Sequence, residues 1–99
     1  MIQEIAHIVV KTGMEKAFEQ GVSQAAPLFQ RAKGCRAMGL TRSIEQPSHY
    51  RLVVSWETLE DHTVHFRSSP DFQAWRALVG SCFEVPPQVE HVTTVLTAF

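Results

Sequence analysis

The stretch His49-Tyr50-Arg51-Leu52-Val53-Val54-Ser55-Trp56-Glu57 (residues 49–57) decides the fold of this chain. Its side chains alternate between two faces of an extended backbone. The more apolar face is formed by Tyr50, Leu52, Val54 and Trp56. A weakly alternating stretch at residues 35–44 precedes it, and Gln46-Pro47-Ser48 between the two favours a turn. The sequence therefore predicts a β-hairpin in the middle of the chain.

A helix is predicted before the hairpin. Apolar residues recur at spacings of three or four between Met14 and Phe29, and Gly34 follows as a terminator. Pro27 lies inside this pattern and lacks the N–H that an interior helical position needs. We expect the helix to kink at this proline or to end around Ala26.

After the hairpin, the pattern indicates a second helix that is broken in two. Thr58 is a plausible cap for the first piece. Its predicted inner face consists of Leu59, His62 or Thr63, and Phe66. Ser69-Pro70 restarts the helix, with serine as cap and proline in the first turn. Its apolar stripe comprises Phe72, Trp75, Leu78 and Val79, and Pro86-Pro87 is expected to stop it.

Strands are predicted at both ends of the chain. Residues 2–10 are mostly apolar and β-branched, interrupted by Glu4 and His7, and residues 89–98 form the closing strand. The order is β-α-β-β-α-β, which is the α+β, ferredoxin-like arrangement with a four-stranded antiparallel sheet. Connection rules place the first strand centrally, between the third and fourth, with the second at an edge. We expect residues 1–99 to form one domain.

The predicted strands carry apolar residues on both faces, whereas the helices cover only one. The bare face needs a partner, and the simplest is the same sheet of a second copy. The sequence therefore predicts a homodimer that forms a dimeric α/β barrel.

Composition excludes several classes of partner. Nine basic and ten acidic residues give a net charge of −1, which offers no electrostatic footprint for nucleic acid or an anionic membrane surface. No apolar run approaches the roughly 18 residues of a membrane span, and the first residues lack the basic region of a secretory signal. Cys35 and Cys82 fit neither a disulfide framework nor a zinc motif. We therefore expect a small cytoplasmic domain.

The region from Val53 to His91 resembles the antibiotic biosynthesis monooxygenase family. The residues that carry the resemblance are Trp56-Glu57-Thr58-Leu59-Glu60-Asp61-His62, Phe66-Arg67, Ser69-Pro70, Phe72, Trp75-Arg76, Pro86-Pro87 and Glu90-His91. The resemblance implies oxygenation of a small aromatic quinol, naphthol or polyketide-type substrate by dioxygen, with no cofactor and no metal. A deprotonated substrate can pass an electron directly to dioxygen, so the site requires an aromatic-lined cavity, a base and a donor for the oxyanion.

His62 and His65 are the candidate catalytic bases. His62 is expected on the inner face of its helix, where a group that titrates near neutrality can take a phenolic proton. Its alternative is a buried structural histidine. His65 lies one turn after Asp61, a spacing that also suits a surface ion pair.

His7 and His91 are candidate substrate-binding residues, because they fall near the middles of the first and last strands. If these neighbouring strands pair centre to centre, both imidazoles lie on one face, either in the pocket or at the dimer seam.

The remaining candidate substrate-binding residues are aromatic and basic: Phe66, Phe72, Trp75, Arg67 and Arg76. The aromatic residues suit a cavity wall and equally a core. The two arginines suit an anionic substrate and equally a solvated surface.

Three other functions remain open. The haem-degrading branch uses an asparagine on the first strand, and this chain contains no asparagine, with His7 at the matching position. A non-catalytic barrel that binds an aromatic ligand or takes part in a stress response fits the same fold. So does an isomerase or decarboxylase in which one histidine moves protons; oxygen uptake distinguishes that enzyme from a monooxygenase.

Overall fold

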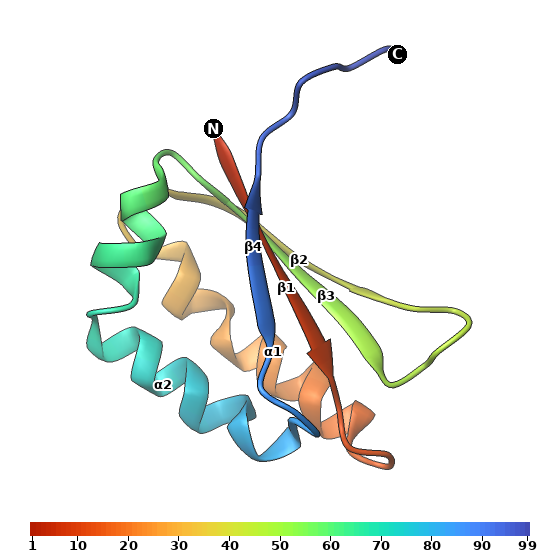
Figure 1. Cartoon of the computed structure of the whole chain (residues 1–99). Coiled ribbons are helices and arrows are strands. Elements are labelled where there is room, and N and C mark those ends of the chain that lie inside the picture. Colours follow the sequence, from red (N-terminus) through yellow and green to blue (C-terminus); the bar gives the residue numbers. More distant parts are fainter.

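A computed structural model describes all 99 residues of the chain, and its element order confirms the predicted arrangement (Figure 1). The elements are β1 (Ile2–Val9), α1 (Glu15–Gln30), β2 (Cys35–Arg42), β3 (His49–Trp56), the π-helix η1 (Asp61–Phe66), α2 (Pro70–Val79), the 3₁₀ helix η2 (Gly80–Cys82) and β4 (Gln88–Val92). The second helix is broken in two, as η1 and α2, because Ser69 caps a new helix. Its side chain accepts a hydrogen bond from the Phe72 backbone N–H, and Pro70 occupies the first turn.

The sheet has the strand order β2-β3-β1-β4, with all neighbours antiparallel. This confirms the ferredoxin-like α+β fold, with the first strand central and the second at an edge. Both helices lie on one side of the sheet, which leaves the other side, the open face, uncovered within the chain (Figure 1).

The core lies between the sheet and the helices. Alternate residues of β1 and β3 are buried there, and the largest fully buried side chains include Trp56, Phe18 and Phe29. The ring of Phe29 contacts those of Phe66 and Trp75, with centroid distances of 4.8 and 5.2 Å. The aromatic residues of η1 and α2 are thereby fixed against α1.

Two helix boundaries differ from the prediction. Helix α1 passes through Pro27 and ends at Gln30, because the proline lies in the last turn and its carbonyl still accepts the Arg31 N–H at 3.2 Å. Helix α2 ends at Val79, ahead of Pro86-Pro87. The intervening residues form η2 and a loop over the edge of the sheet.

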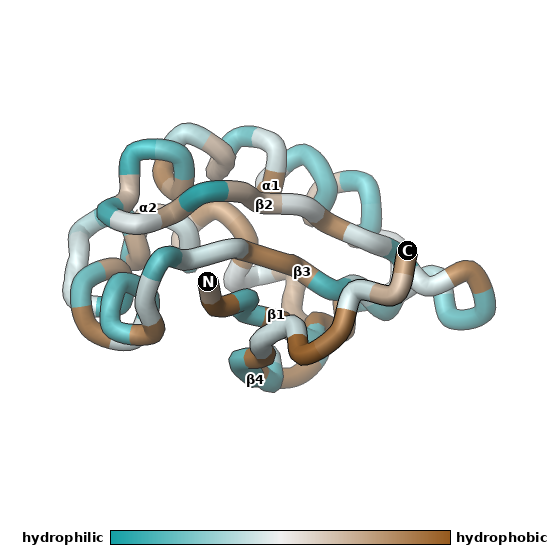
Figure 2. Tube along the Cα trace, turned by 90° about the horizontal axis from the view of Figure 1, so that it is seen from above, coloured by the Kyte–Doolittle hydropathy of each residue, from teal (hydrophilic) through white to brown (hydrophobic).

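The predicted closing strand is also shorter than expected. Strand β4 ends at Val92, which pairs with Gln3, so the chain beyond it passes the start of β1 and loses its neighbouring strand. Residues 93–99 lead away from the sheet as a tail (Figures 1 and 2). Val95 and Leu96 are 93% and 77% exposed, and Phe99 is fully exposed.

Neither α1 nor α2 combines the length and the apolar character that a membrane-crossing helix needs.

Candidate active site

A cleft of about 640 Å³ opens between the helix-covered face of the sheet, α2 and the loop that follows it. This volume lies within the usual range for small-molecule sites. Phe72, Trp75 and Phe83 contribute aromatic rings to its lining, and Glu4, His62 and Arg67 contribute polar groups. The cleft therefore joins an aromatic wall to a small set of ionisable side chains.

His62 reaches the cleft from η1. The first turn of η1 is anchored by Thr58, whose hydroxyl accepts the Asp61 N–H at 3.1 Å. The imidazole is 3% exposed and stacks on the Trp56 indole, with the ring centroids 5.3 Å apart and the planes 21° apart. π-helical turns are frequent at functional sites. The local helix geometry and the tryptophan together hold the ring in one orientation.

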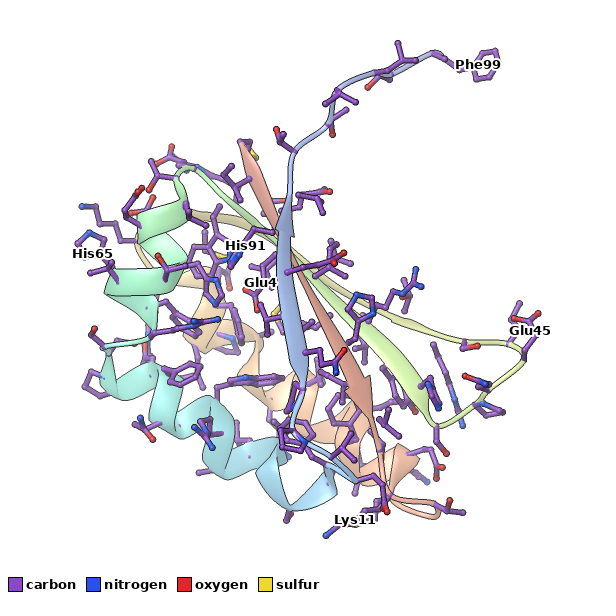
Figure 3. The ribbon with its side chains drawn as sticks, in the orientation of Figure 1. Glu4, Lys11, Glu45, His65, His91 and Phe99 are labelled. Atoms are coloured by element: carbon purple, nitrogen blue, oxygen red, sulfur yellow. The ribbon has the colours of Figure 1, made fainter.

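His62 belongs to a buried polar cluster made of Glu4, Trp56, His62 and His91. The Trp56 Nε1–H donates to Glu4 Oε1 at 3.1 Å, and the same oxygen lies 3.3 Å from His62 Nε2. On the other side of the ring, His62 Nδ1 and His91 Nε2 share a hydrogen bond of 2.8 Å. The cluster joins β1, β3, η1 and β4 in one chain of polar contacts. Glu4 and His91 lie close together on neighbouring strands in Figure 3.

Burial shifts the titration of this cluster. Desolvation raises the pKa of Glu4, although the Trp56 hydrogen bond and the Arg67 charge oppose the rise. Desolvation, Arg67 and His91 lower the pKa of His62 to about 4. Burial and Arg67 also lower the pKa of His91. His62 is consequently neutral at neutral pH, and a neutral imidazole is the form that accepts a proton.

The strand register overturns the expected pairing of His7 with His91. His7 lies opposite Gln88, and His91 lies opposite Glu4. Since side chains alternate along a strand, His7 points to the open face and His91 to the helix-covered face. His7 instead lies 3.7 Å from Glu90, also on the open face.

The other predicted site residues divide into three groups. Arg67, Phe72, Trp75 and Arg76 line the cleft with His62. Phe66 is buried in the core beside it. His65 is exposed and projects outward from η1, away from the cleft (Figure 3). Leu59, expected on the inner face with His62, is 41% exposed.

Glu4 and Trp56 were missed as site residues. Glu4 shares the buried face of β1 with Ala6 and Ile8, at the spacing of two that places side chains on one face. The signal that could have identified Glu4 is a carboxylate on a strand face that is otherwise apolar. The sequence places Trp56 on the apolar face of the hairpin and in the stretch that carries the family resemblance, but the role of its indole N–H depends on the pairing of β3 with β1.

The cluster does not form a metal site. Glu4 and His91 approach opposite nitrogens of His62, so the three side chains do not converge on one point. No group of three or more histidine, cysteine, aspartate or glutamate side chains in the chain is placed to hold a metal ion.

Comparisons with known proteins bear on this site. The family model described as antibiotic biosynthesis monooxygenase matches residues 1–78. The uncharacterised protein YczJ of Bacillus subtilis strain 168 is 41% identical over 95 residues, which cover 96% of this chain and 100% of that protein.

Solved structures agree with this assignment. A Bordetella bronchiseptica protein that carries the same family name is 60% identical, with a TM-score of 0.95, covering 96% of this chain and 97% of its own. SnoaB of Streptomyces nogalater, a cofactor-independent oxygenase, has a TM-score of 0.84 over 98% of this chain and 95% of its own, at 16% identity. The second likeness shows a shared fold. The resemblance seen in the sequence is confirmed.

Proposed function

The chain belongs to the antibiotic biosynthesis monooxygenase family, and on that premise we propose that it is a cofactor-independent monooxygenase. Its substrate is a small aromatic compound of the quinol, naphthol or polyketide type, and its co-substrate is dioxygen. The substrate supplies both reducing electrons, one oxygen atom enters the ring system, and the other leaves as water.

The observation that carries this proposal is a neutral, buried imidazole at the wall of an aromatic cleft. The proton that the substrate hydroxyl loses passes to the buried cluster, where His62 can take it up because its lowered pKa keeps it unprotonated at neutral pH. Phe72 and Trp75 bind the flat ring, and removal of water strengthens the electrostatics of the site. Arg67 places a positive charge beside the cluster, where it stabilises the phenolate and the reduced oxygen.

We also propose that the working form is a homodimer. The open face carries Ile5, Val9 and Val53 among polar residues, and none of these three is fully exposed or fully buried in the chain. The exposed apolar residues of the tail extend this surface beyond the sheet (Figure 2). A second copy would cover both.

Oxygen consumption tests the proposal. Purified protein is screened with quinols and naphthols in an oxygen electrode, alongside His62→Ala and, as a matched control, His65→Ala. We expect His62→Ala to lose about 100-fold or more in kcat, the usual contribution of a general base, and His65→Ala to keep its activity. Equal rates for the wild type and His62→Ala contradict the role of His62. Ligand binding without oxygen uptake favours the non-catalytic barrel instead.

A further inference from the structure

Both ring nitrogens of His62 are already in contact with protein groups. Nε2 lies 3.3 Å from Glu4 Oε1, and Nδ1 is hydrogen-bonded to His91 Nε2 at 2.8 Å. The ring itself is 3% exposed. A proton that reaches His62 therefore arrives through one neighbour and moves on through the other. Glu4 is the neighbour that lines the cleft, and His91 is the neighbour that is partly exposed.

We propose that Glu4, His62 and His91 form a reversible proton-transfer chain, in which Glu4 takes the substrate's proton and His91 stores it. This inference rests on the proposed function and adds a catalytic residue, Glu4, to it. Once Glu4 holds the substrate's proton, it donates to His62 Nε2, His62 carries its own proton on Nδ1, and His91 Nε2 accepts from that Nδ1–H.

Proton transfer along this chain conserves every proton. The substrate O–H bond breaks and its proton binds the Glu4 carboxylate. Glu4 then protonates His62 Nε2 while the Nδ1 proton of His62 moves to His91 Nε2, which leaves His91 as an imidazolium ion. The reverse movement returns this proton to the oxygen atom that leaves as water, and the second hydrogen of that water comes from the C–H bond of the substrate carbon that is oxygenated. No net proton is released, in agreement with the conversion of substrate and dioxygen into oxygenated product and water.

The surroundings of Glu4 suit this role better than a purely structural one. No lysine or arginine lies within ion-pair distance of its carboxylate, and its only such contact is His62. A buried carboxylate without a lysine or arginine partner is costly, so Glu4 is poorly suited to a purely structural position. Burial raises the pKa of Glu4 and thereby brings it closer to that of a phenol, which eases proton transfer between them.

Other side chains near the proton-transfer chain affect the protonation of its three members. Trp56 donates to Glu4 Oε1, and Glu4 Oε2 has no hydrogen-bond partner inside the cluster. Arg67 opposes protonation of Glu4, His62 and His91 alike. The Cys35 thiol on β2 interacts electrostatically with Glu4 and has a raised pKa, so it stays uncharged. Return of the proton is favoured, because the lowered pKa of His91 makes it a weak proton store.

The test uses Glu4→Gln and His91→Gln, with Glu90→Gln as the matched carboxylate control on the open face. Glutamine keeps an oxygen that accepts from Trp56 Nε1, so Glu4→Gln retains the fold. We expect kcat to fall about 100-fold or more in Glu4→Gln and about 10-fold or more in His91→Gln, while Glu90→Gln keeps the wild-type rate. Wild-type kcat in Glu4→Gln, with only thermal stability altered, overturns the proposal and makes Glu4 structural.

A second measurement is independent of turnover. Nitrogen-15 NMR of the labelled histidine rings reports the tautomer and pKa of His62 and His91. We expect Glu4→Gln to shift both histidines, although Glu4 touches only one of them, and Glu90→Gln to shift neither. Unchanged His91 resonances in Glu4→Gln contradict the proposed proton-transfer chain. If no substrate consumes oxygen while both histidines respond, the proposed oxygenase activity fails and the proton chain stands.

Discussion

The two faces of β1 differ in burial and in polar contacts, although alternate residues of one strand form both. Glu4, Ala6 and Ile8 face the helices and are buried, whereas Ile5 and His7 face outward and are only partly covered. On the covered face a carboxylate has to be matched by specific donors, and every buried side-chain polar atom in the chain has a partner. On the open face, His7 Nε2 lies 3.7 Å from Glu90 Oε1, and both side chains are exposed to solvent. The covered face therefore holds the buried polar cluster, whereas the open face is the surface through which we propose that two copies associate.

The largest loss of stability is expected from Trp56→Ala on the covered face. The side chain is fully buried, stacks on His62 and donates to Glu4. Its removal leaves a cavity and an unsatisfied carboxylate, which costs about 3–5 kcal/mol in the free energy of unfolding. Urea denaturation measures the loss. Ser55→Ala, the neighbour on the open face, is the control and should change stability by less than about 1 kcal/mol. Equal losses of stability in Trp56→Ala and Ser55→Ala would contradict the proposed difference between the two faces.

Acid should destabilise the covered face through His62. Its pKa is lowered from 6.5 to about 4 in the folded chain, so between these values the unfolded chain binds more protons than the folded one. Stability present above pH 6.5 is lost as pH falls toward 4, by about 3 kcal/mol in total.

The raised pKa of Glu4 acts in the opposite sense, since it favours the folded state at low pH and loses that contribution as pH rises. Comparison with His62→Gln isolates the histidine. Thermal unfolding from pH 7 to pH 4 should show a steeper fall in wild type than in this variant. Parallel curves for the two proteins would contradict the pKa of His62.

The fold could be predicted from the sequence because it depends on local periodicity. The alternation in residues 49–57 and the Ser69-Pro70 cap each act within a few residues, and connection rules supplied the strand order. The site depends on register, which local pattern does not encode. One residue of shift in β4 decides whether His91 meets His7 or His62, and the structure selects His62. Glu4 escaped notice for the same reason, because its neighbours come from β3, η1 and β4.

Association through the open face should be sensitive to the tail. We expect the triple variant Val95→Ser, Leu96→Ser, Phe99→Ser to weaken the dimer by about 10-fold or more in Kd, since each change removes apolar area that a second copy would bury. The stability of the protomer itself should be nearly unchanged, because these side chains contact nothing in the core. Sedimentation across a concentration series measures both the wild type and the variant. Thr93→Ser with Thr97→Ser is the control. A wild-type chain that sediments as a folded monomer at micromolar concentration refutes the dimer.

The smallest effect is expected from His65→Ala, three residues from His62 in the same π-helix. His65 is exposed, and no hydrogen bond or ion pair of its side chain is present in the structure. Its removal should change the free energy of unfolding by no more than about 0.5 kcal/mol and leave oxygen consumption at the wild-type rate. Thermal unfolding and the oxygen electrode measure the two quantities. A marked loss of activity at unchanged stability would mean that His65 reaches the active site of a second copy. Activity would then depend on dimer formation.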